Sequence, residues 1–220
     1  HQRVRADDQP RDLMLPAVRA IADRMILDSA NLKYIAAILP RGGLGRIVPG
    51  TGWTVRQVIG HVGDAEARHV AAMERLLAGA TPFPADYDRD DANAASAQRD
   101  AKAPLKSLVA RIDDAVSRSV PLYECVTASI AASRARGKDT LAVLLDRWSR
   151  HYVAHGIDLV DALPEIRFDP MLLNWLLFVD FEGEPDAAAR QRKLWEDVRA
   201  LPDEDDDEDL PDPEEDQDAF

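Results

Sequence analysis

Two histidines four residues apart, His151 and His155, have the spacing that most directly allows chemistry in this chain. Residues four apart on a helix project from the same side about one turn apart, so both imidazoles can reach one metal ion. Both also fall near the apolar stripe of the surrounding sequence and are expected to face inward. Hydrogen bonding of each ring within the core is the alternative. The pair is not the zinc-protease motif, because Tyr152 stands where that motif requires a glutamate base.

A third histidine, His61, lies in the first two turns of another expected helix, at the edge of its apolar stripe. A side chain at that edge can enter a cleft between helices, and helical bundles build internal metal sites from residues on facing helices. A half-exposed surface histidine is the alternative. The spacing of the residues leaves both interpretations open.

Apolar residues recur at helical spacing through most of the chain and define the elements that must position these side chains. Thr54 and Gln57 form a capping box at the start of one helix, and Gly79 stops it. Pro121 should kink or break the third helical region. No segment shows the period of two that a strand requires. The expected helices span residues 12–39, 54–78, 92–103, 105–120, 122–136, 139–163, 170–181 and 185–201.

Four long amphipathic helices predict an all-α fold, a four-helix bundle with extra C-terminal helices packed on it. The net charge of −13 comes from the end of the chain, because residues 201–220 hold 12 acidic and no basic residues. Such a block repels itself and cannot bury apolar surface, which predicts disorder. We therefore expect a flexible segment 1–11, a bundle 12–165, additional helices 166–201 and a disordered acidic tail 202–220.

The composition argues against several classes of protein. Nucleic-acid binding is not expected, because no basic stripe with interleaved aromatic residues is present. No membrane span is expected either, because the longest apolar run, residues 171–179, falls far short of the roughly 20 residues required. The single cysteine, Cys125, allows no internal disulfide and is expected to be a small buried residue. With no secretory leader recognisable, the expected location is the cytoplasm.

The two histidine segments resemble the motifs of the DinB/YfiT-like superfamily. The first runs from Trp53–Val55 to His61, and the second is His151 with His155, preceded by Thr140–Leu141. The resemblance covers about residues 12–165 and implies an up-down four-helix bundle with a divalent metal bound by the three histidines. The superfamily includes thiol-dependent transferases and isomerases that use bacillithiol or mycothiol, and metal-dependent hydrolases.

Three neutral imidazoles suit Zn, Ni, Fe or Mn, and the ligand type does not select among them. Three protein ligands leave a position open for water or substrate, and the ion would lower the pKa of a water or thiol bound there. Asp158, on the same side as His155, and Asp64, one turn beyond His61, are the candidate catalytic side chains. Asp158 could orient an imidazole N–H or act as a base. Glu66 and His69 are expected to form an interior pair.

The predicted function is therefore a divalent-metal-binding protein that activates a thiol or water, of the thiol-dependent S-transferase or isomerase type. It implies a small-molecule substrate, a low-molecular-weight thiol and a possible homodimer. One alternative is a metal-dependent hydrolase. Another is a non-catalytic bundle that acts as an interaction or stress-associated module through its C-terminal helices and acidic tail. An enzyme requires a pocket at the metal position, whereas the module predicts a closed pocket and exposed apolar surface around residues 170–200.

Overall fold

Helices make up nearly all regular structure in residues 15–136, 139–181 and 185–201, which are the residues that the computed structural model describes. The expected flexible segment 1–11 and the acidic tail 202–220 lie outside them. In chain order the elements are α1 (Pro16–Ala37), η1 (Gly43–Gly45), α2 (Val55–Leu77), α3 (Arg89–Asp100), α4 (Leu105–Glu124), α5 (Ala128–Ala131), β1 (Arg134–Arg136), β2 (Asp139–Thr140), α6 (Leu141–Ala162), η2 (Pro164–Ile166), α7 (Pro170–Leu176) and α8 (Pro185–Arg199).

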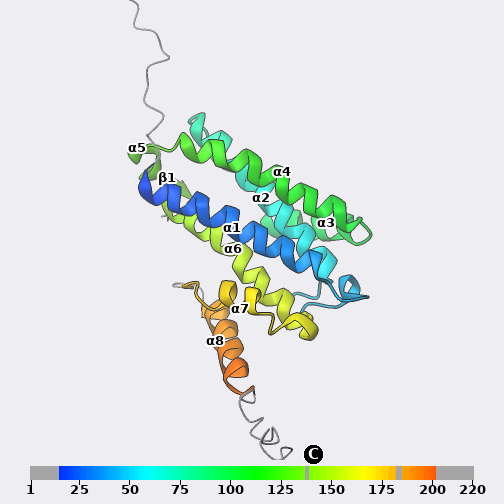
Figure 1. Cartoon of the computed structure of the whole chain (residues 1–220). Coiled ribbons are helices and arrows are strands. Elements are labelled where there is room, and N and C mark those ends of the chain that lie inside the picture. Colours follow the sequence, from blue (N-terminus) through cyan, green and yellow to red (C-terminus); the bar gives the residue numbers. More distant parts are fainter. Residues whose placement is uncertain (1–14, 137–138, 182–184, 202–220) are drawn as a thin grey trace, which may run out of the picture.

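The four long helices α1, α2, α4 and α6 lie side by side as a bundle (Figure 1). Both α1 and α2 pack on α4 and on α6. Helices α2 and α4 run in the same direction, because Arg56 bonds the carbonyl of Ala103 near their starts and Glu66 bonds Ser119 further along. The short α3 lies between them in sequence. The apolar stripes of the four helices meet in one buried core. The predicted all-α bundle is confirmed.

Local capping sets where the two histidine-bearing helices begin. The backbone N–H of Thr54 donates to Oε1 of Gln57 at 2.9 Å, and the N–H of Gln57 donates to Oγ1 of Thr54 at 3.3 Å. This capping box was predicted from the sequence and is confirmed. Thr140 caps α6 in the same way, accepting from the N–H of Val143 at 3.4 Å. The starts of α2 and α6 then place the histidines two to four turns inside each helix.

Three details differ from the sequence-based expectation. Helix α4 continues through Pro121, because this proline lies in its last turn and removes only one helical hydrogen bond. The expected helix 122–136 gives way to the short α5 and to an antiparallel pair of strands, β1 and β2. Cys125 is exposed rather than buried. It is the C-cap of α4, and its neighbours Tyr123 and Val126 enter the core instead.

Helices α7 and α8 pack against one end of α6 (Figure 1). Leu172 on α7 and Leu194 on α8 are fully buried in the same core as the bundle. The side-chain amide of Gln191 on α8 donates to the carbonyls of Leu176 and Val179, both at 2.8 Å. The expected domain boundary at residue 165, between the bundle and the additional helices, stays a prediction. None of the described helices combines the length and apolarity that a membrane crossing requires.

Candidate metal centre

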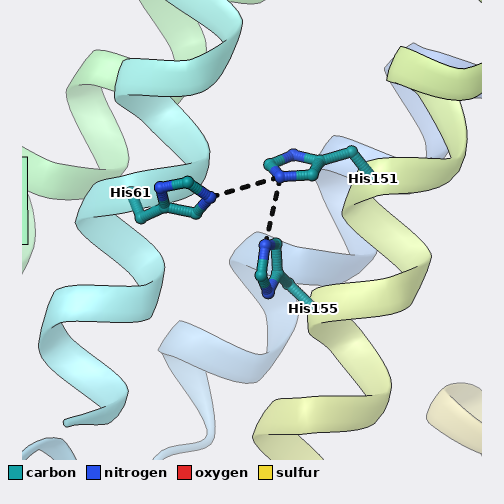
Figure 2. A group of neighbouring side chains, drawn as sticks. All are labelled: His61, His151 and His155. Carbon is teal, nitrogen blue, oxygen red and sulfur yellow. Dashed lines mark hydrogen bonds between the residues drawn. The ribbon is translucent and has the colours of Figure 1, made fainter. Parts of the chain in front are cut away.

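The three histidines singled out from the sequence meet between α2 and α6. His61 projects from α2, and His151 and His155 project from α6 toward it (Figure 2). The Nε2 atom of His151 lies 3.3 Å from Nε2 of His61 and 3.1 Å from Nε2 of His155. All three ligand atoms lie within 4.8 Å of one another. We call these three residues the histidine cluster.

The spacing of these nitrogens matches what one metal ion imposes on its ligands. Imidazole nitrogens bind Zn²⁺ at 2.0–2.1 Å, so two of them in tetrahedral geometry lie about 3.3–3.4 Å apart. The two short Nε2 separations in the cluster, 3.3 and 3.1 Å, are close to that value. The cluster is therefore nearly pre-arranged for coordination.

Burial favours the neutral form of two rings of the cluster, His61 and His151. Desolvation lowers the pKa of His61 to about 3, and the neighbouring His155 and Arg68 act in the same direction. Burial also holds the pKa of His151 well below its usual range, again with help from His155 and His61. Neutral imidazoles keep a lone pair on one ring nitrogen, which is the form that binds a metal. Nδ1 of His61 is buried and has no hydrogen-bond partner within the described part of the chain.

Asp158 orients one member of the cluster. Its Oδ2 lies 3.0 Å from Nδ1 of His155, one turn earlier on α6. A carboxylate oxygen accepts hydrogen bonds, so in this contact Nδ1 of His155 is the donor and carries a ring proton. The lone pair is then on Nε2, which faces His151. This contact is the arrangement by which carboxylates support metal-binding histidines.

Asp64 has other partners. Its carboxylate accepts from Ser96 on α3 and Arg111 on α4, both at 2.6 Å, and also pairs with Arg99. Burial alone would raise the pKa of Asp64, but these hydrogen bonds outweigh it and hold that pKa below its usual range. The contacts tie α2 to α3 and α4. The catalytic role of Asp64 stays a prediction.

A cavity of about 280 Å³ opens beside the cluster, and His61 and His151 form part of its wall. His69 also lines it, with its ring stacked on Trp148 at a centroid distance of 4.2 Å. Glu66 is buried as expected and accepts a hydrogen bond from Ser119. Its Oε2 lies 3.5 Å from Nδ1 of His69, but that nitrogen has no hydrogen-bond partner among the described residues and His69 lines the cavity, so the predicted interior pair is only partly formed. The remaining lining residues are Ala65, Arg68, Phe83, Tyr87, Arg89, Asp90, Asn93, Leu144 and Arg147.

Some of these cavity residues carried a signal that the sequence-based reasoning did not use. Arg68 follows His61 by seven residues and Arg147 precedes His151 by four, so each shares a helix face with a histidine of the cluster. Phe83 and Tyr87 stack on each other at 4.7 Å in the loop after α2. Their position beside the cavity follows from the path of that loop, which no periodicity describes.

Comparisons with known proteins agree with this architecture. The family model described as the mycothiol maleylpyruvate isomerase N-terminal domain matches residues 29–160. A solved structure of a mycothiol-dependent maleylpyruvate isomerase has a TM-score of 0.54 at 16% identity, and one of a histidine-to-alanine mutant has 0.55 at 15%. Each alignment covers 74% of this chain and 68% of that protein. None of the curated proteins matches the sequence.

The family match includes the complete histidine cluster and Asp158, and it ends before α7 and α8. It covers more than half of the chain, whereas the structural likeness by itself establishes the fold alone. The chain belongs to the mycothiol maleylpyruvate isomerase N-terminal domain family, within the DinB/YfiT-like superfamily.

Proposed function

We propose that this protein is a metal-dependent enzyme that activates a low-molecular-weight thiol for transfer to, or isomerisation of, a small electrophilic substrate. The observation that carries the proposal is the convergence of three Nε2 atoms on one point, beside a cavity whose wall includes His61 and His151. The similar solved structures are those of a mycothiol-dependent enzyme. As part of the proposal, we infer that this chain also uses a thiol of this class.

The residues present fit a divalent cation. His61, His151 and His155 would hold it through Nε2, and the ring proton of His155 is already directed away by Asp158. The Nε2 atom of His151 lies within 3.3 Å of Nε2 of His61 and within 3.1 Å of Nε2 of His155, so three possible ligand atoms face the same point. A cation bound there would lower the pKa of a thiol or water bound at its open coordination position.

The chain itself would bind and orient the substrate. Arg68, Arg89 and Arg147 line the cavity together with Asp90, so the wall carries an excess of positive charge. This suits a substrate with one or more carboxylate groups. The stacked ring pairs in the wall offer flat apolar surface to its unsaturated part.

The cavity favours an enzyme over a non-catalytic module, because a module needs no small-molecule space at the histidines. The exposed apolar side chains of Met171 and Phe178 are the feature that the module predicts. A hydrolase would use the same centre with water in place of the thiol. The role of the acidic tail and the possible homodimer stay predictions.

Metal analysis of the native protein beside two single variants tests the proposal. After removal of metal and reconstitution with Zn²⁺, the native protein should retain about one ion per chain. His151→Ala should lose it, whereas His69→Ala, which removes a cavity histidine outside the cluster, should keep it. Unchanged metal content in His151→Ala would refute the site.

Turnover assays then separate the chemistries. The thiol proposal expects the reconstituted protein to consume a low-molecular-weight thiol, such as mycothiol, together with an unsaturated carboxylate electrophile, and His151→Ala to be inactive. Hydrolysis of ester or amide substrates without any thiol requirement would favour the hydrolase. A metal-loaded protein inactive in both assays would favour the module.

A further inference from the structure

We propose that Arg190 on α8 is a positioning residue for the metal centre and acts through Asp158 on His155. The proposal rests on the proposed metal function and extends it to a helix outside the family match, which ends at residue 160. It makes the docking of α8 part of the metal site, although no residue of α8 contributes a ligand atom to the cluster.

The contacts form a chain of three side chains. Nε of Arg190 lies 3.2 Å from Oδ1 of Asp158, and Oδ2 of the same carboxylate lies 3.0 Å from Nδ1 of His155. The Asp158 side chain is only 7% exposed. Each of its two oxygens therefore faces a different partner, one on α8 and one on α6. The Arg190 contact is an ion pair rather than a hydrogen bond, since Nε of Arg190 has no hydrogen-bond partner among the described residues.

The charge of Arg190 has a physical role at this position. A buried carboxylate is costly unless a cation or hydrogen-bond donors compensate it. The guanidinium of Arg190 holds Oδ1 of Asp158 in place, so that Oδ2 of the same carboxylate stays directed at Nδ1 of His155 and accepts a hydrogen bond from it. That acceptor keeps the imidazole in the tautomer whose Nε2 lone pair points into the cluster. The neighbouring Asp161 forms a separate ion pair with Arg167, in which Oδ1 lies 2.8 Å from Nη1 of the arginine.

Helix α8 is held firmly enough to serve this purpose. Leu194, one turn beyond Arg190, is fully buried, and Gln191 donates hydrogen bonds to one carbonyl at the end of α7 and to one in the segment after it. Asp197 forms a further ion pair with Arg167. The Arg190 side chain is 39% exposed, so its replacement removes the ion pair without opening the core.

Zinc affinity of the full-length protein provides the first test, measured by competition with a chromophoric chelator. Loss of a residue that supports a metal ligand typically weakens binding 10–100-fold. We expect Asp158→Asn to weaken zinc binding 10–100-fold and Arg190→Gln to weaken it about 10-fold. Arg192→Gln removes the same charge from an exposed position of α8 and should leave the affinity unchanged. The double variant of Arg190 and Asp158 should bind no more weakly than Asp158→Asn alone.

The protonation of the His155 ring in the metal-free protein provides the second test. Long-range ¹H–¹⁵N correlation spectra report which ring nitrogen carries the proton. We expect the Nδ1–H form in the wild type, a shift toward the Nε2–H form in Arg190→Gln, and no shift in Arg192→Gln. Thermal unfolding of the metal-free variants verifies that each is folded.

These outcomes separate the two proposals. A wild-type protein that binds no zinc would end the proposed function, while the tautomer comparison would still decide the role of Arg190. Arg190→Gln with the tautomer of the wild type would overturn the positioning role, whether or not its zinc affinity falls. An additive loss in the double variant would also contradict it, because Arg190 would then act independently of Asp158.

Discussion

Asp28 on α1 is a buried acid whose ionisation opposes folding. The residue is 1% exposed, and its Oδ1 accepts a hydrogen bond from Nε1 of Trp175 at 2.8 Å. Oδ2 is buried without a hydrogen-bond partner among the described residues. Burial raises the pKa of Asp28 to about 6, although the Trp175 bond and the charge of Arg24 act in the opposite direction. We therefore predict that Asp28→Asn becomes increasingly favourable, relative to the wild type, as the pH rises.

The sign follows from proton linkage. Because the folded-state pKa lies above the unfolded value of 3.8, the folded protein binds more protons between these values, and stability falls as the pH rises through this window. With values of 3.8 and about 6, the loss is about 2 kcal/mol at pH 5 and about 3 kcal/mol at pH 7. An amide does not ionise. The free energy of unfolding of the variant, minus that of the wild type, should thus increase by about 1 kcal/mol from pH 5 to pH 7.

Urea unfolding of both proteins at pH 5, 6 and 7 measures this difference. The new amide leaves one buried NH₂ group without an acceptor, but that cost is the same at each pH and cancels in the comparison. Asp23→Asn, an exposed acid on the same helix, is the matched control and should show a much smaller trend. A variant-minus-wild-type difference for Asp28 that stays flat, or that decreases with pH, would refute the reasoning.

Two further predictions concern the helices that carry the histidines. A Cβ at Gly156 would lie 2.6 Å from the ring of the buried Trp175, which its bond to Asp28 holds in place, so Gly156→Ala should lower the free energy of unfolding by about 1–3 kcal/mol. Gly45→Ala, where the Cβ would meet open space, is its control in thermal unfolding; equal melting temperatures for both variants would contradict the packing argument. Thr54→Ala should lower the free energy of unfolding by about 1 kcal/mol, because the capping box is lost. Thr54→Ser should keep most of this stabilisation, because serine retains the hydroxyl group. Equal losses in chemical denaturation would rule out the cap as the cause.

Local patterns determined most of the helices. The capping box at Thr54 and the periodicity after it predicted α2, and the same reasoning predicted α6 behind Thr140, because caps and the 3.6-residue period depend only on neighbouring residues. The spacing of His151 and His155 also followed from one helix. The third member of the cluster, His61, was assigned through the resemblance to a family, since no local pattern relates residues 90 positions apart.

Contacts between elements were decided by the tertiary structure. The sequence placed Asp64 one turn from His61, but in the packed structure its carboxylate accepts hydrogen bonds from arginines on α3 and α4. The sequence predicted a buried Cys125, but this residue caps the C-terminal end of α4 and is exposed there. The pairing of Arg190 with Asp158 has no sequence signal at all. Periodicity states which face of a helix is apolar, but the rotation, direction and offset of one helix against another depend on how all side chains of the core pack together.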